Sequence, residues 1–347
     1  PTFGAKRLYF PSARSPPSAP MQSHEPYLIL AASSLPSRMA PDPRLASHAR
    51  GGTSVSALEV SLASIFNQTR GPDEVILSLP KTYRRTVWGR EDAWTSAAAA
   101  EHAQRLGRAN LHVQTADDEG PGTKLLAALP LARRLAATRG LRRREPWLVL
   151  FDDDVAYDSL ALQWLAGHIK ATPAAEELRR AWSFCVYVLS PPAESPPLTR
   201  SAPLVVGQGV DLFAMPLAVL NDIEAFYHKA LTYSPKWFYH DDVWISAYLH
   251  GAAQVRVYRA QRGRDGKNCQ QGKAVYDYLF LSRADGVGAL KGNLSRHTLN
   301  TELMQAREEM ARDGLLPGAR LQPTSDQWAS DRWVRLHHGP RPSRRPA

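Results

Sequence analysis

The sequence predicts an α/β protein with a mostly parallel central sheet flanked by helices. Apolar runs typical of strands alternate with amphipathic segments typical of helices, and this alternation is characteristic of βαβ units. Residues 147–151 are all apolar, as expected for a strand that is covered on both faces. The chain has 347 residues, 44% of them hydrophobic, which is enough for one sizeable core.

The first half of the chain contains the predicted parallel strands. Residues 1–24 are rich in Pro and Ser and are expected to form a flexible leader or stem. Gly71 and Pro72 end the first helix, and Pro80 closes the second strand. The expected elements are a strand at 27–32, a helix at 55–68, a strand at 73–80, a helix at 93–108, a strand at 110–114, a helix at 122–138 and a strand at 147–155.

The second half is less regular, because a Pro-rich stretch at 190–201 interrupts it. We expect one folded domain over residues 25–303, with two halves that meet at residue 155, followed by a C-terminal extension over 304–347. The expected elements are helices at 159–169 and 174–181, a strand at 183–189, extended chain at 204–213, a helix at 217–231 and a helix that begins near residue 241.

Charge and cysteine content narrow the expected partners and compartment only a little. The formal net charge is +10, but the Arg clusters at 133–144 and 341–345 accompany no nucleic-acid motif, so we expect no nucleic-acid partner. There is no apolar run near 18 residues, so no membrane span is expected in this chain. The two cysteines, Cys185 and Cys269, permit at most one disulfide, and two free thiols are the alternative.

Three consecutive acids follow the apolar run at 147–151. Carboxylates this close repel one another, and a divalent cation removes that conflict. Side chains alternate along extended backbone, so Asp152 and Asp154 are expected to share a direction while Asp153 points the other way. The segment therefore predicts a D-x-D cation site at the carboxyl end of a strand. A solvated turn rich in Asp is the alternative.

Two further acids, Asp241 and Asp242, precede an apolar helical segment. One Asp at a helix start is explained by capping, which stabilises a helix by about 1 kcal/mol. Capping needs only one Asp, so it does not explain the presence of the second acid. If it lies at the same edge of the sheet as the D-x-D segment, it can act as a general base.

Six segments in this order resemble GT-A fold, nucleotide-sugar-dependent glycosyltransferases of the family-2-like, D-x-D containing kind. The resemblance covers about residues 27–300. The segments are S-L-P-S-R at 34–38 with its strand, F-N-Q-T at 66–69, P-D-E-V-I-L-S-L-P at 72–80, D-D-E-G-P-G-T-K-L at 117–125, F-D-D-D at 151–154 and H-D-D-V-W-I-S-A-Y-L at 240–249.

The resemblance implies a nucleotide site in the first half of the domain. Ser33, Leu35 and Arg38 match the turn that meets the base and ribose of the nucleotide; a polar turn with a solvated arginine is the alternative. Lys124 matches a lysine placed against the nucleotide sugar at a helix start. A solvated lysine is the alternative there.

The resemblance also implies Mn²⁺ or Mg²⁺ as cofactor. Asp154 matches the direct metal ligand that bridges to the diphosphate. Asp152 matches a second residue near the metal, which contacts the ribose or a water molecule. Asp153 is expected to orient hydroxyl groups of the sugar. His297 is our choice for a third ligand, and His337 and His338 are other candidates. A surface histidine is the alternative for each.

For the acceptor side, the resemblance implies that Asp242 is the general base and that Asp241 contacts acceptor or donor sugar. This arrangement fits direct displacement with inversion, although a retaining enzyme of the same fold is also compatible. Gly207, Gln208 and Gly209 are candidates for an acceptor-side loop, or are ordinary loop residues. Trp244 is a candidate for stacking on a sugar face, as is Trp237, with core packing as the alternative.

The expected function is transfer of a sugar from a UDP- or GDP-sugar to a hydroxyl of a glycan, protein or lipid. A catalytically inactive nucleotide-sugar or glycan-binding homologue is the first alternative. A haloacid dehalogenase-type phosphatase is the second, but Ala156 and the late position of the acidic strand fit it poorly. The leader and two N-glycosylation sequons, at Asn67 and Asn293, suggest the secretory (Golgi) lumen, with a cytoplasmic location as the alternative.

Overall fold

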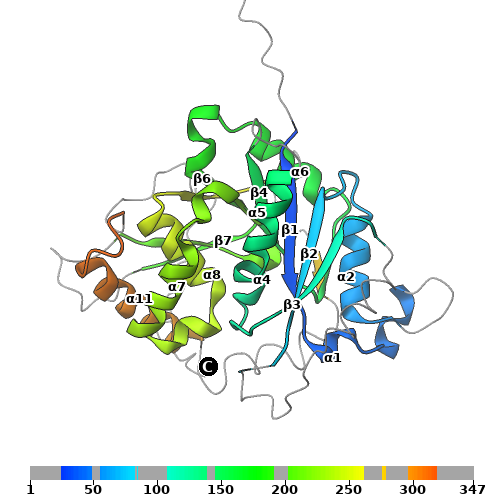
Figure 1. The fold of residues 1–347 in the computed structure, drawn as a ribbon, viewed down its shortest axis with the longest axis horizontal. Helices are drawn as coiled ribbons and strands as arrows, with labels where there is room; N and C mark the ends of the chain where they lie inside the picture. Colours follow the sequence, from blue (N-terminus) through cyan, green and yellow to red (C-terminus); the bar gives the residue numbers. More distant parts are fainter. Residues whose placement is uncertain are drawn as a thin grey trace, which may run out of the picture.

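The computed structural model has a mixed seven-stranded sheet at its centre, in the order β10-β6-β9-β4-β1-β2-β3 (Figure 1). The structure describes residues 25–48, 55–82, 84, 108–138, 145–190, 202–261, 276–278 and 296–318. The strands of this sheet are β1 (Tyr27–Ser33), β2 (Glu74–Pro80), β3 (Leu111–Ala116), β4 (Pro146–Leu150), β6 (Arg180–Ser183), β9 (Phe213–Pro216) and β10 (Arg256–Arg259).

One strand reverses direction in this sheet. Strand β1 runs parallel to β2 and β4, β2 runs parallel to β3, and β10 runs parallel to β6, whereas β9 is antiparallel to β4 and to β6. In the β4–β9 pair, Leu150 is the partner of Phe213. The amino end of β9 therefore lies beside the carboxyl end of β4, at the edge where parallel α/β sheets bind ligands.

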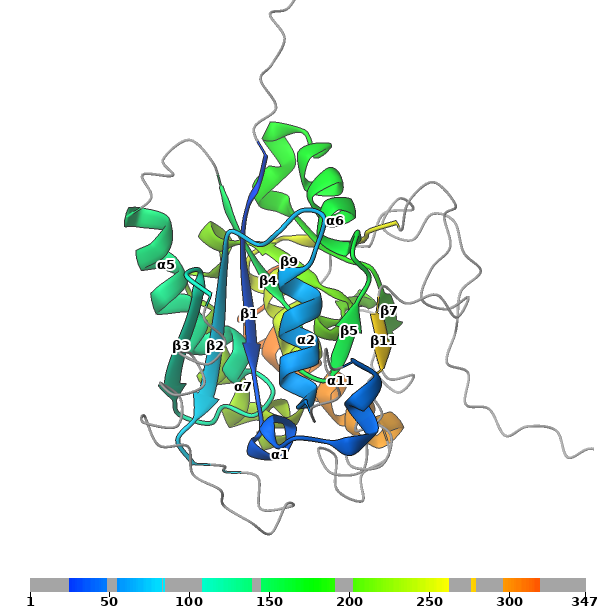
Figure 2. The same cartoon turned by 90° about the vertical axis from the view of Figure 1, so that its right-hand side faces the viewer.

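Helices cover both faces of the sheet (Figure 2). Ile29 and Ala31 of β1 belong to the core on one face, whereas Leu28 and Leu30 belong to the core on the other. The first face is packed by α4 (Thr123–Leu126), α5 (Ala128–Thr138), α7 (Ile223–Tyr233), α8 (Asp241–Ala247) and α11 (Arg296–Arg312), and the second by α2 (Ala57–Phe66) and α6 (Ala161–Lys170).

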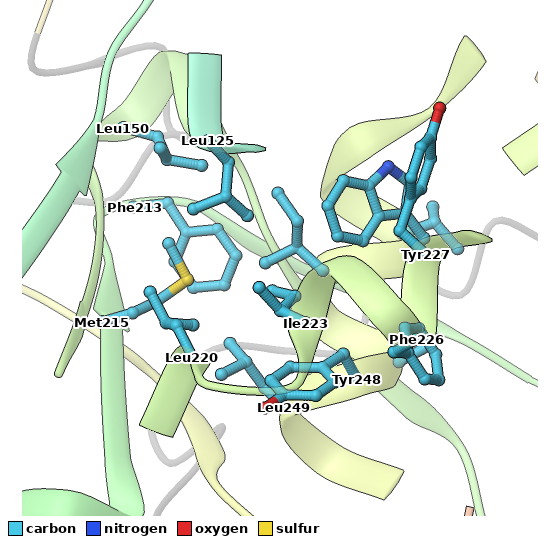
Figure 3. Packing of buried hydrophobic residues seen from close by; sticks show 14 of the residues in the cluster. Leu125, Leu150, Phe213, Met215, Leu220, Ile223, Phe226, Tyr227, Tyr248 and Leu249 are labelled. Atoms are coloured by element: carbon cyan, nitrogen blue, oxygen red, sulfur yellow. The ribbon is translucent and has the colours of Figure 1, made fainter. Parts of the chain in front are cut away.

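The core of the first face joins both halves of the chain. Figure 3 shows Leu125 of α4 and Phe213 of β9 packed with Ile223 of α7 and with Leu249. Buried residues Met310 and Leu316 belong to the same core, so packing continues beyond the end of α11.

Shorter elements complete the described fold. The shorter elements are α1 (Pro36–Met39), η1 (Pro43–His48), β5 (Val155–Tyr157), η3 (Ala174–Arg179), β7 (Val186–Leu189), β8 (Leu204–Gly207), η4 (Gly209–Asp211), η5 (Leu217–Leu220), η6 (Pro235–Tyr239), the π-helical η7 (Tyr248–Ala252) and β11 (Tyr276–Tyr278). Among them, β5 pairs with β11 and β7 pairs with β8, which gives two small antiparallel sheets.

The α/β prediction with a mostly parallel, helix-flanked sheet is confirmed, with local differences. The strand expected at 147–155 is two strands, β4 and β5, separated by the acidic turn. The helix expected at 122–138 is divided into α4 and α5; Pro130 follows the break and has no N–H to continue the α4 hydrogen bonds. The helix expected at 174–181 is a 3₁₀ turn that leads into β6, and the helix expected at 93–108 lies outside the described residues. Among the helices described, none has the length and apolar character needed to cross a bilayer.

Candidate functional site

The three acids that follow β4 lie in a turn at the carboxyl edge of the sheet. Arg38 of α1, the short helix just beyond the end of β1 (Figure 1), pairs with two of them. Its Nη1 donates to Asp153 Oδ1, and its Nη2 lies 2.9 Å from Asp154 Oδ2. Burial alone would lower the pKa of Arg38, but the carboxylates of Asp153, Asp154 and Asp152 raise it. Arg38 is therefore a fixed charge within the site and is not a solvated side chain.

The expected alternation of the three acids is not what the structure shows. Asp153 and Asp154 share Arg38 as their partner, while Asp152 pairs with Lys124. The reason is that regular strand geometry ends at Leu150, and residues 153 and 154 form a turn in which period-two alternation no longer applies.

Lys124 connects the two acidic segments. Its Nζ lies 2.7 Å from Asp152 Oδ1 and 3.0 Å from Asp241 Oδ2, and its side chain is 8% exposed. Burial alone would lower the pKa of this ammonium group, but Asp152, Asp241 and Asp242 raise it. The lysine is therefore expected to stay charged, and it holds the D-D-D turn and the start of α8 together.

Asp242 has a different environment from Asp241. Asp241 is 6% exposed and faces Lys124, whereas Asp242 is only partly buried and its Oδ1 accepts a hydrogen bond of 2.8 Å from the Gly209 N–H. No side chain caps α8, and His240 occupies the cap position. Neither Asp is therefore the N-cap, although both lie in the first turn of α8, where the helix dipole favours carboxylates.

The carboxyl groups of Asp242 and Asp154 have raised pKa values. Burial, with the neighbouring charge of Asp241, raises the pKa of Asp242 to about 8, against the opposing effect of Lys124. Burial also raises the pKa of Asp154 to about 6; Arg38 opposes this shift, and Asp153 and Asp152 add to it. Proton affinity near neutral pH is what a general base needs.

The segment at 207–211 runs along α8, and its glycines lie close to neighbouring side chains. The Gly207 N–H donates to Ser246 Oγ at 3.2 Å. A Cβ on Gly207 would lie 2.7 Å from the Phe213 ring, and a Cβ on Gly209 would lie 2.8 Å from Lys124 Nζ. Both glycines thus permit a close approach that the lysine bridge and the β9 core need.

The structure adds residues that sequence reasoning did not select. Asp211 ends η4 beside the acidic turn, and burial together with the charges of Asp242 and Asp152 raises its pKa well above the ordinary value. The Tyr157 hydroxyl accepts from the Asp152 N–H at 2.9 Å and donates to Val210 O at 3.2 Å. An acid inside the apolar 204–213 segment was the available signal for Asp211.

Other predicted residues are placed less directly. Ser33 and Leu35 lie at the carboxyl end of β1, partly buried, where a nucleotide contact stays a prediction. Trp244 and Trp237 are fully buried, and Trp244 packs on Tyr227 with ring centroids 4.8 Å apart. Trp244 is therefore a core aromatic, as in the alternative considered for it, and offers no open face to a sugar.

The late histidines are not tested by the structure. The backbone of His297 lies in the first turn of α11, but its side chain is outside the described residues, as are His337 and His338. His240 was not proposed as a ligand; ligand atoms of His240, Asp241 and Asp242 lie within 4.8 Å of one another. Lys124 already pairs with Asp241 at that position.

The donor set fits a hard divalent cation. The side chains that face this edge provide carboxylate oxygens, which Mn²⁺ and Mg²⁺ prefer. Within the described part of the chain, the lysine and arginine that pair with these acids are Lys124 and Arg38. Buried oxygens Asp153 Oδ2 and Asp211 Oδ1 have no hydrogen-bond partner there. The acids are Asp152, Asp153, Asp154, Asp211, Asp241 and Asp242.

Comparison with known proteins does not assign the chain to a family. No protein-family model and no curated protein sequence matches the chain. Among solved structures, the chain is similar to 4-diphosphocytidyl-2C-methyl-D-erythritol synthase, at 14% identity over 72% of this chain and 93% of that chain, with a TM-score of 0.36. It is also similar to the nucleoside-diphosphate-sugar pyrophosphorylase from Vibrio cholerae RC9, at 11% identity over 59% of this chain and 78% of that chain, with a TM-score of 0.28. Similarities of this size do not identify an activity.

Proposed function

We propose that this protein is a metal-dependent glycosyltransferase of the GT-A fold that transfers a sugar from a UDP- or GDP-sugar to an acceptor hydroxyl. The main support is the meeting of two acidic segments at one edge of the sheet, where Lys124 pairs with both Asp152 and Asp241. Sugar transfer from a nucleoside diphosphate needs positive charge at the leaving group and a base at the acceptor, and both fit at this edge.

Asp152 and Asp154 would hold Mn²⁺ or Mg²⁺, which would supply positive charge to the departing diphosphate. Arg38 fixes the carboxylate of Asp154 in place. Lys124 adds a permanent positive charge beside Asp152 and can contact the diphosphate or the donor sugar.

Asp242 would accept the proton of the acceptor hydroxyl. The Gly209 N–H binds its Oδ1, and among the described residues no donor binds its Oδ2, so that oxygen is left for the acceptor. A base that removes the acceptor proton directly is consistent with single displacement and inversion at the sugar carbon. The acceptor itself would be a hydroxyl of a glycan, protein or lipid.

The test is release of nucleoside diphosphate from a panel of nucleotide sugars, with and without Mn²⁺. We expect slow release from one donor, lost on addition of EDTA and lost in Asp154→Ala. Asp117→Ala is the matched control, because Asp117 is 86% exposed and lies outside the site. Release that is unchanged in Asp154→Ala would contradict the proposal.

The same assay separates the alternatives. Inorganic phosphate produced from any phosphate ester, without preference for a nucleotide sugar, would indicate a phosphatase. Nucleotide binding without turnover, also in the presence of hydroxyl acceptors, would indicate an inactive binding protein.

We also propose residence in the secretory lumen. Cys185 is disulfide-bonded, and disulfides persist in oxidising compartments; Cys269 lies outside the described residues. The sequon residue Asn67 is exposed at the carboxyl end of α2, where an oligosaccharide can attach, whereas Asn293 lies outside the described residues. We expect native protein to lose mass on treatment with an N-glycosidase and Asn67→Gln to lose less. An unmodified protein in the cytosolic fraction would contradict this.

A further inference from the structure

The reversed strand β9 brings the segment that contains Asp211 close to the turn that contains Asp152. In the antiparallel pair, Leu150 at the end of β4 is the partner of Phe213 at the start of β9. Two residues beyond Leu150 is Asp152, and two residues before Phe213 is Asp211. A second link supports the same placement, because the Tyr157 hydroxyl binds both the Asp152 N–H and the carbonyl of Val210.

The carboxylate of Asp211 has no partner in the part of the chain that the structure describes. Its side chain is buried, with 1% of the residue exposed, and its Oδ1 has no hydrogen-bond donor. The charged groups that act on it are Asp242 and Asp152, both of the same sign. The other acids of the site all have a partner: Asp153 and Asp154 bind Arg38, Asp152 and Asp241 bind Lys124, and Asp242 binds the Gly209 N–H.

A buried carboxylate without a donor is unfavourable, and a bound cation removes that cost. Lys124 does not relieve it, because its Nζ is held between Asp152 and Asp241. The unpartnered Oδ1 of Asp211 thus lies in a segment next to the Asp152 turn, and carboxylates from two adjoining segments are a donor arrangement suited to a divalent cation.

We propose that Asp211 is a metal ligand and binds the divalent cation together with Asp152. It would take the place of the third protein ligand for which the sequence suggested His297. The identity of the cation as Mn²⁺ or Mg²⁺ rests on the proposed glycosyltransferase function, whereas the ligand assignment rests on the packing of Asp211.

The experiment is a titration of the 347-residue chain with MnCl₂, alone and with UDP, in which free Mn²⁺ is measured by its electron paramagnetic resonance signal. We expect Asp211→Asn to bind Mn²⁺ at least about 10-fold more weakly than the original chain, while Asp117→Asn binds with unchanged affinity. Asn has the shape of Asp without its charge, so the fold should be kept.

A thermal melt of the same proteins gives a second readout. Added MnCl₂ should raise the Tm of the original chain and of Asp117→Asn, but not that of Asp211→Asn. Without metal, Asp211→Asn should melt at the same or a higher temperature than the original chain, because Asn is neutral without taking up a proton or a cation.

The outcomes separate this inference from the proposed function. Equal Mn²⁺ affinity in Asp211→Asn and in the original chain, or no Mn²⁺ binding by either, would overturn the ligand assignment, whatever the donor assay shows. Mn²⁺ binding that depends on Asp211 in a protein that hydrolyses no nucleotide sugar would support the ligand assignment and overturn the glycosyltransferase proposal.

Discussion

Asp242→Asn is expected to reduce sugar transfer by about 10²- to 10⁴-fold, the usual contribution of a positioned general base. The Asn carbonyl can still accept the Gly209 N–H that now binds Asp242 Oδ1, so the local fold should be kept. What is lost is the ability to take the acceptor proton. Transfer is measured with the donor identified in the hydrolysis panel, and binding of UDP by calorimetry.

The control for this variant is Asp117→Asn, on an exposed acid outside the site. We expect full transfer by the control and unchanged UDP binding by both proteins. Transfer by Asp242→Asn at the rate of the control would show that Asp242 is not the base. Loss of UDP binding in Asp242→Asn would show that the substitution disturbs the donor site instead.

The raised pKa of Asp242 also predicts how stability depends on pH. In protein freed of divalent cations, the folded state binds the Asp242 proton more tightly than the unfolded chain does, because the folded pKa is about 8 and the ordinary value is 3.8. This contribution to stability is complete below about pH 4 and is lost as the pH rises towards 8. Urea unfolding from pH 4 to pH 8 should show a smaller decline for Asp242→Asn than for the original chain. Equal declines would contradict the raised pKa.

Lys124→Met is expected to lower the free energy of unfolding by about 3–5 kcal/mol at pH 7, as for removal of one partner from a buried ion pair. Methionine keeps most of the volume, so the loss arises from charge. Asp152 and Asp241 would be left at the sheet edge without their shared cation. Urea unfolding measures the loss. Lys81→Met is the control, since Lys81 is exposed and 3.8 Å from Asp117, and it should change the free energy by less than about 1 kcal/mol.

A double variant tests whether the loss arises from the bridge. If Lys124 stabilises the fold by pairing with Asp241, then Asp241→Asn should restore part of the stability lost in Lys124→Met, with a coupling of about 0.5–3 kcal/mol. Strictly additive effects of the two substitutions would show that the lysine acts through packing and not through this ion pair.

The sequence predicted the regular part of the fold because those elements depend on local pattern. The strand at 27–32 and the helix at 55–68 correspond to β1 and α2, and the latter has a capping box of Ser56 and Glu59. The predictions from the sequence were weaker where tertiary contacts determine the secondary structure. The segment 183–189 contains only the last residue of β6 and then all of β7, which belong to different sheets; this division follows from pairing with β9 and β8 and not from the residues of the segment.

The site was predicted in part for the same reason. Both acidic segments could be recognised because each begins or ends a regular element. Lys124 was expected to meet the nucleotide sugar, and in the structure it pairs with Asp152 and Asp241. Asp211 was missed because its place depends on the antiparallel register of β9 with β4, which no local pattern reports.

The reversed strand β9 has a wider consequence for how this edge can be built. Each parallel strand can deliver only the residues that come after it in the chain, since its carboxyl end meets the edge. Strand β9 runs in the opposite direction, so the residues that precede it, from Gly207 to Asp211, lie at this edge. If β9 were parallel to its neighbours, the same segment would lie at the opposite edge of the sheet. Changes in the length or composition of that incoming segment can therefore reshape this edge, where we propose that the acceptor binds, while the strands and turns of the first half keep their geometry.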